Sequence, residues 1–289
     1  AIDKKILGKD HPYYAIDISN LANLYQEMGN YQKAIRLHLE AKEIRHKNFG
    51  KESIYYAESL DRLGILYKES GDFEVAKKLF LESNSILEKL LGKDHTEYAW
   101  SLNNLASIYL LQSNFLEAES LFLQSLAIFK KLFGKLHQDV AISLGNLGDL
   151  YFEMKDFERA ESSYKEALDI LEKTVGKTHP DYLNILQHLA AVFEITNRFD
   201  QAELLLNEKM NADQSKLLKA ATFLSERELE KYITTFQVDG NYYASYLLNI
   251  SSNDSLLSKS ILPELIYDHS LFFKGFLSST AWKLQSLAN

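Results

Sequence analysis

The sequence contains no cysteine, and this absence removes several kinds of site at once. Disulfide bonds, thiolate metal ligands and a cysteine nucleophile are all excluded. Helix breakers are also scarce: 289 residues include only 3 prolines and 12 glycines, beside 16 phenylalanines and 17 tyrosines. Few breakers and many aromatic residues favour long, packed helices.

Positive charge is in the minority, with 32 basic residues against 40 acidic ones and a net charge of −8. No run of lysine and arginine stands out, so we expect no nucleic-acid partner, because a phosphate-binding surface needs a concentrated positive field. No stretch approaches the roughly 18 apolar residues of a membrane span, and no secretory leader is seen. We therefore expect a cytoplasmic protein with no membrane partner.

What the sequence does contain is a repeat. Five of its glycines follow one another at steps of 42 residues, and a lysine follows each of them: Gly8, Gly50, Gly92, Gly134 and Gly176. Three further columns keep the same step: leucine at 21, 63, 105, 147 and 189; an aromatic residue at 25, 67, 109, 151 and 193; and alanine at 34, 76, 118, 160 and 202. A fixed period in this range is the signature of a solenoid.

Each repeat is predicted to be a helical hairpin. In the first helix of repeat one, which we call helix A, the spacing of Ile18, Leu21, Tyr25 and Met28 places all four on one core face. A turn follows, and four residues are predicted to cap the second helix, helix B: Asn30, Asp72, Asn114 and Asp156. The alanine column lets helix B cross helix A closely, and the Gly-Lys glycine ends helix B.

These columns resemble the tetratricopeptide repeat, and the segments Leu7-Gly8-Lys9-Asp10-His11-Pro12 and Leu105-Ala106-Ser107-Ile108-Tyr109 are similar to the 42-residue variety of kinesin light chains and many bacterial sensors. The resemblance covers residues 1–210. It implies an all-α, right-handed superhelical solenoid that binds proteins or peptides. The fifth repeat departs from the pattern, since Arg198 replaces the capping residue and helix B is expected only over about 200–210. Residues 1–8 align with 169–176, so we expect the chain to open inside a repeat of a longer protein.

The period is lost over residues 211–289, where we expect a C-terminal connector or cap built as a long-helix hairpin. Ser225-Glu226-Arg227-Glu228 is a capping box, an apolar stripe runs over 229–250, and a second helix is expected over about 261–287. The segments at 221–228 and 267–275 resemble the helical region that joins tetratricopeptide repeats to a CHAT domain, a caspase-like protease module of bacterial proteins. This resemblance implies a regulatory region, with a protease domain of the same polypeptide as a further partner.

Two motifs resemble metal-binding or catalytic sites but are better explained by structural roles. His11, His95, His137 and His179 occupy equivalent positions in different repeats, too far from one another to share a metal ion, so we predict that they order loops by hydrogen bonds. Ser162-Ser163-Tyr164-Lys165 fits the S-x-x-K pattern of some acyl enzymes, but Tyr164 falls in a core column and no companion motif follows. We expect no catalytic residue, metal or cofactor, and no enzyme activity in this chain.

The candidate partner site lies on helix A, about 200° round from the core face, where side chains are expected to point into a concave groove. Equivalent positions form a ladder of hydrogen-bonding groups: Asn20, Arg62, Asn104, Asn146 and His188. In tetratricopeptide domains the matching asparagine binds ligand backbone amides. We add Asn23, Asp149 and an apolar anchor of Trp100, Leu111 and Ile142. The alternatives are that these side chains are merely solvated, or that the chain's own tail covers Trp100.

Two functions follow from these patterns. The first is a module that senses a partner and regulates a CHAT protease, and the second is a free-standing adaptor for linear peptides, as the likeness to kinesin light chains suggests. A His…Cys pair encoded downstream in the natural gene would favour the first.

Overall fold

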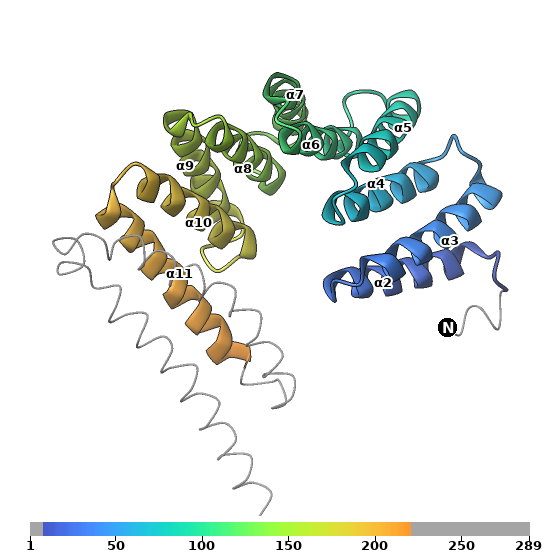
Figure 1. The fold of residues 1–289 in the computed structure, drawn as a ribbon, viewed down its shortest axis with the longest axis horizontal. Coiled ribbons are helices and arrows are strands. Elements are labelled where there is room, and N and C mark those ends of the chain that lie inside the picture. The colour runs from blue at the N-terminus through green and yellow to red at the C-terminus, as the bar shows by residue number, and fades with distance from the viewer. Residues whose placement is uncertain (1–7, 221–289) are drawn as a thin grey trace, which may run out of the picture. The chain divides into compact units, whose positions relative to one another are not determined.

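The computed structural model describes residues 8–220, which form ten α-helices and no strand (Figure 1). Helix A of the five repeats is α2 (Pro12–Glu27), α4 (Ile54–Glu69), α6 (Thr96–Leu111), α8 (Gln138–Glu153) and α10 (Pro180–Ile195). Helix B is α3 (Tyr31–Phe49), α5 (Phe73–Leu91), α7 (Phe115–Phe133), α9 (Phe157–Thr174) and α11 (Phe199–Ala220). Both sets begin at steps of 42 residues, so the predicted all-helical fold of tandem hairpins is confirmed.

The chain divides into two compact units, Ala1–Leu150 and Tyr151–Asn289. In the first unit, α2 packs on α3, α4 on α5 and α6 on α7, and each hairpin also contacts the next through α3 with α4 and α5 with α6. In the second unit, α10 packs against both α9 and α11. The predicted hairpin over 229–287 and the first seven residues lie outside the described part of the chain.

The four histidines cap helix A, which confirms the prediction that they order loops. In each case the ring Nδ1 accepts a hydrogen bond from the backbone N–H two residues on, at 3.2 Å from Tyr13, 3.4 Å from Glu97, 3.2 Å from Asp139 and 3.3 Å from Asp181. Ser53 takes the same place before α4. Such a bond satisfies one of the free N–H groups at a helix start.

Helix B is capped largely as predicted. Asn30, Asp72 and Asp156 each accept from the N–H three residues on, at 3.4, 3.3 and 3.1 Å. Asn114 is the exception, since its side chain makes no capping bond, so the prediction is wrong there. At the other end, Gly50, Gly92 and Gly134 close helix B at φ of 79–80°, a conformation in which a side chain is strained.

A second left-handed position recurs in the turn between helix A and helix B. It is held by glycine in the first two repeats but by side chains in the other three: Ser113, Lys155 and Asn197, at φ of 59°, 60° and 58°. Left-handed backbone costs free energy for every residue with a Cβ atom, and among these residues asparagine tolerates it best.

Replacing Lys155 with glycine is therefore expected to raise the free energy of unfolding by about 0.5–1 kcal/mol. The Lys155 side chain is exposed, so little packing is lost. Chemical denaturation of the full chain measures the change. Asn197→Gly is the matched control and should gain less, and equal or reversed effects at the two sites would contradict the explanation.

The core follows the columns, with one correction in the first repeat. The alanine column is fully buried in all five repeats, and four of the five leucines are nearly so. Leu21, however, is 43% exposed and Met28 is 76% exposed. The reason is that helix B of the preceding repeat completes this face: Leu63 packs with Ala34 and Ile35 of α3, whereas no helix within residues 8–220 precedes α2.

The fifth helix B is longer than expected. It was predicted to end near residue 210, but α11 has 22 residues and continues to Ala220. Leu206 and Met210 are buried, and so is an ion pair of the same helix, Lys209 Nζ to Asp213 Oδ2 at 3.3 Å. Loss of the sequence period after residue 211 therefore does not mark the end of the helix. A domain boundary at 210 remains a prediction.

Candidate functional site

The predicted partner residues of α6 and α8 lie on partly accessible sides of their helices. Asn104, Ile142, Asn146 and Asp149 are half-buried, and Leu111 is exposed. Their neighbours in sequence point into the core, including the buried residues Leu105, Ile108, Leu147 and Leu150. In these two helices the partly accessible side chains and the buried ones thus alternate with the helical period.

The first unit also contains a pocket of about 370 Å³, which we call the first-repeat pocket. It is lined by Pro12, Tyr13, Ile16, Ser19, Asn20 and Asn23 of α2, Arg45 and Phe49 of α3, and Tyr55, Glu58 and Arg62 of α4. Three of the predicted partner residues, Asn20, Asn23 and Arg62, are thus brought together in one concavity. The pocket combines amide, charged and aromatic side chains.

Charge in this pocket centres on two arginines and one glutamate. Arg45 Nη1 donates to Ser59 Oγ at 2.9 Å, and Arg45 Nη2 lies 3.9 Å from Glu58 Oε2. Arg62 Nη2 lies 3.6 Å from the other oxygen of Glu58. Burial lowers the pKa of Arg45, Glu58 raises it and Arg62 lowers it. One carboxylate thus stands between two cations without a short hydrogen bond to either.

Beneath the pocket, His38 fixes the orientation of Asn23. His38 is fully buried, and its pKa is lowered to about 4 by burial and then by Arg62 and Arg45, so the ring is neutral near pH 7. Its Nε2 lies 3.2 Å from Asn23 Oδ1. This distance fits a neutral ring that donates through Nε2 to the amide oxygen, which leaves the Asn23 NH₂ group as a donor.

Arg45 and His38 were missed in the sequence, although the repeat alignment carried a signal for both. The position of Arg45 is apolar in the next three repeats, and so is that of His38: Leu87, Phe129 and Leu171 for the first, Phe80, Phe122 and Tyr164 for the second. All six of these residues are nearly or fully buried. Helix B of the first repeat therefore places polar groups where its counterparts place core side chains.

Two further predicted residues, Trp100 and His188, do not line the first-repeat pocket. Trp100 is half-buried and packs edge-on against Phe129, with ring centroids 5.1 Å apart. His188 belongs to the second unit, where it is exposed and lies edge-on to Tyr164 at 5.8 Å. Tyr164 is buried, as predicted for its core column, and Lys165 of the S-x-x-K motif pairs with Glu161 at 2.6 Å.

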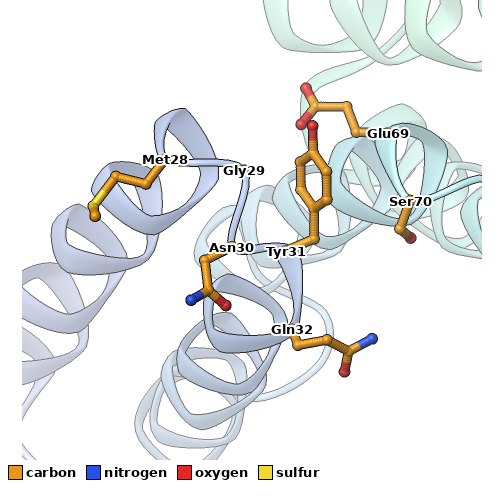
Figure 2. Close-up of a pocket in the computed structure, with 7 residues that line it drawn as sticks. All are labelled: Met28, Gly29, Asn30, Tyr31, Gln32, Glu69 and Ser70. Carbon is orange, nitrogen blue, oxygen red and sulfur yellow. The ribbon is translucent and has the colours of Figure 1, made fainter.

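A larger hollow, of about 520 Å³, lies at the turn between α2 and α3. Its lining comes from residues 28–32 and from Glu69 and Ser70 at the end of α4, and Figure 2 shows that these side chains point in different directions rather than toward one centre. Glu69 is already engaged by Gln26 Nε2, at 2.9 and 3.0 Å. Because its polar groups do not converge, this hollow is a weaker candidate than the first-repeat pocket.

Comparison with known families identifies the repeats. The family model described as tetratricopeptide repeat matches four overlapping stretches, residues 14–89, 71–131, 97–173 and 139–215. The chain belongs to the tetratricopeptide-repeat family. Proteins built from tetratricopeptide repeats are generally scaffolds that bind other proteins or peptides, rather than enzymes. None of the curated proteins compared with the sequence matches it.

Solved structures show which variety of tetratricopeptide repeat this is. The chain is 27% identical to BtubC (BKLC) from P. vanneervenii, with a TM-score of 0.60, over 70% of this chain and 80% of that one. It is 25% identical to a putative kinesin light chain from Podosopora anserina with nearly identical TPR-like repeats, with a TM-score of 0.56, over 74% of this chain and 99% of that one. The repeats are thus of the kinesin-light-chain-like type.

None of the helices between residues 8 and 220 combines the length and apolar character that crossing a bilayer requires. In the same part of the chain, no three His, Asp or Glu side chains gather as a metal site would need.

Proposed function

We propose that this chain is a protein-interaction module whose helix-A face grips an extended segment of a partner protein. The observation that carries the proposal is the first-repeat pocket, where Asn20, Asn23 and Arg62 meet in one concavity. A side-chain amide both donates and accepts, so it can bind a peptide group whatever side chain the ligand carries.

The groove is proposed to continue along α6 and α8. Asn104 and Asn146 repeat the position of Asn20, and Trp100, Leu111 and Ile142 offer partly exposed apolar surface. Large aromatic side chains near the centre of an interface often dominate its binding free energy, while single amide contacts contribute less. Trp100 is therefore the proposed anchor, and the asparagines set the path of the ligand backbone.

Substitution along this face should weaken binding in a graded way. Peptides selected on the full chain from a displayed random library can be titrated by fluorescence anisotropy. We expect Trp100→Ala to cost about 2 kcal/mol of binding free energy, roughly thirtyfold in Kd, and Asn104→Ala to cost about 0.5–1.5 kcal/mol. Lys78→Ala on α5, an exposed lysine of helix B, is the control and should bind as the wild type does.

One result would contradict the proposed groove. If a folded double variant, Trp100→Ala with Asn104→Ala, keeps wild-type affinity for every selected peptide, the binding surface lies away from helix A of the third repeat. Circular dichroism and the melting temperature establish that the variant is folded. Loss of affinity in the Trp100→Ala and Asn104→Ala variants, with Lys78→Ala unaffected, supports the proposed groove.

The wider role that we propose is regulation of a caspase-like CHAT protease domain, in a cytoplasmic bacterial protein. Its support is the resemblance at 221–228 and 267–275, segments that lie outside the described residues. A free-standing adaptor is the second candidate, favoured by the 25% identity to a putative kinesin light chain. Sequencing the natural gene beyond this segment separates the two, because only the first requires a His…Cys pair downstream.

A further inference from the structure

We propose that the first-repeat pocket binds a carboxylate of the partner, supplied by an aspartate or glutamate side chain of an otherwise extended peptide. The inference rests on the proposed function and names the chemistry of one of its contacts. It is carried by the charge balance of the pocket, by the burial of Arg45 and by the donors that surround it.

The charge balance of the pocket is opposite to that of the chain. Arg45 and Arg62 face a single carboxylate, Glu58, so the lining carries an excess positive charge, whereas the chain as a whole carries −8. Both contacts with Glu58, at 3.9 and 3.6 Å, are longer than a hydrogen bond. A second carboxylate would therefore neutralise the remaining positive charge of the two arginines.

Arg45 is a buried cation at a position where the next three repeats pack an uncharged side chain. It is 6% exposed, and its counterparts Leu87, Phe129 and Leu171 are buried hydrocarbon. A buried charge is costly unless it is paired and hydrogen-bonded. Within the described residues, this guanidinium makes one hydrogen bond, to Ser59, although it carries five N–H groups. A carboxylate accepts two parallel bonds from such a fork.

The walls of the pocket suit an acidic side chain. Asn20 and the Asn23 amide, which His38 holds through its oxygen, are available to bind the neighbouring peptide groups. Tyr13 and Tyr55 are more than half exposed, and the rings of Tyr55 and Phe49 lie 4.5 Å apart. These rings would cover the aliphatic part of the acidic residue and shield the ion pair from water, which strengthens it.

A double-mutant cycle tests the inference on the full chain. Peptides are selected from a displayed library of random dodecapeptides, and each acidic position of a selected peptide is changed to its amide. We expect one acidic position at which Glu→Gln lowers affinity about tenfold or more, and Arg45→Leu to cause the same loss. The two changes together should cost little more than either alone, because both break one contact.

Arg45→Leu should still fold, since it restores the residue found at Leu87 and Leu171, and its melting temperature should be unchanged or higher. Arg36→Leu, an exposed arginine on the same helix, is the control of equal charge and should bind normally. Glu58→Gln removes the competing carboxylate and should strengthen acidic-peptide binding about threefold to tenfold, a gain that a purely structural role would not give. Glu117→Gln, an exposed residue of α7, controls for net charge.

The outcomes separate this inference from the proposed function. Selected peptides that need no acidic residue, tolerate Arg45→Leu and lose affinity with Trp100→Ala would overturn the carboxylate site and leave the groove standing. A library that yields no binding peptide would overturn both. Tighter binding when phosphoserine replaces the critical glutamate would reassign the pocket to phosphorylated partners and overturn the carboxylate assignment.

Discussion

Replacing Asp61 with asparagine is expected to raise the free energy of unfolding at pH 8 by about 2–4 kcal/mol, with little effect below pH 4. Asp61 lies in α4, and its Oδ1 is buried without a hydrogen-bond partner in the described part of the chain. Burial raises the pKa of this carboxyl from 3.8 to about 7, against the smaller, opposite influence of the Ser83 and Ser101 hydroxyl groups. Glu58 raises it further and Arg62 lowers it.

The direction of the effect follows from proton linkage. Because the folded pKa lies above the unfolded one, the folded chain binds the proton more tightly between pH 4 and pH 7. The contribution of Asp61 to the free energy of unfolding is therefore highest below about pH 4. It falls as the pH rises to about 7 and is constant above that. The gap between the two pKa values corresponds to about 4 kcal/mol as an upper limit.

The third repeat already has an asparagine at the position of Asp61. The residue equivalent to Asp61 is Asn103, which is buried and donates from Nδ2 to Ser143 Oγ at 3.3 Å. An asparagine at 61 can donate to Ser101, the counterpart of Ser143, without carrying charge into the core. Urea denaturation of wild type and variant from pH 4 to pH 8 measures the difference. Equal stability of the two at pH 8, or a gain that does not depend on pH, would disprove a titrating Asp61.

Truncating Phe80 to alanine is expected to lower the free energy of unfolding by about 3–5 kcal/mol. The side chain is fully buried, in a cluster with Ala76 of its own helix and with Leu105 and Ile108 of the next repeat. Packing around it is tight: a Cβ added to Gly64 would lie 2.6 Å from the Phe80 ring. The cavity would therefore open where the second and third repeats meet, and their coupling should weaken.

The control for Phe80 is Leu116, an apolar residue on α7 that is 78% exposed. Leu116→Ala should change the unfolding free energy by less than about 0.5 kcal/mol. Denaturant titration of both variants, followed by circular dichroism, provides the comparison. Similar losses for the two would mean that the burial of Phe80 does not determine the stability of this repeat.

Much of the fold could be predicted from the sequence because its determinants are local. The start of every helix A follows from a capping side chain that bonds two or three residues ahead, as with His95 and Ser53. The apolar columns repeat because each hairpin packs on a similar neighbour. Prediction failed where local patterns were insufficient. Asn114 is a residue type that commonly caps helices, but its side chain makes no capping hydrogen bond. Helix α11 continues to Ala220, although the repeated columns of residues end before that point.

The candidate site was predicted only in part, and the reason is distance along the chain. Asn20 and Arg62 were placed on the accessible face by helical periodicity alone. Whether they share a pocket depends on how α2, α3 and α4 pack, which no local pattern contains. Arg45, Phe49 and Tyr55 entered the site through that packing, since they do not belong to the helix-A column from which the groove was predicted.

The sequence alone thus determined the repeat length, the order and ends of most helices, and the family, because these depend on contacts within a few residues and on a period that can be counted. Only the tertiary structure decided which copies of a repeated position are buried. Leu21 is exposed while Leu63 is covered, and Arg45 is buried beside Ser59 of the next helix. Burial depends on the neighbouring helices, and it sets both the charge of Asp61 and the donors left free in the first-repeat pocket.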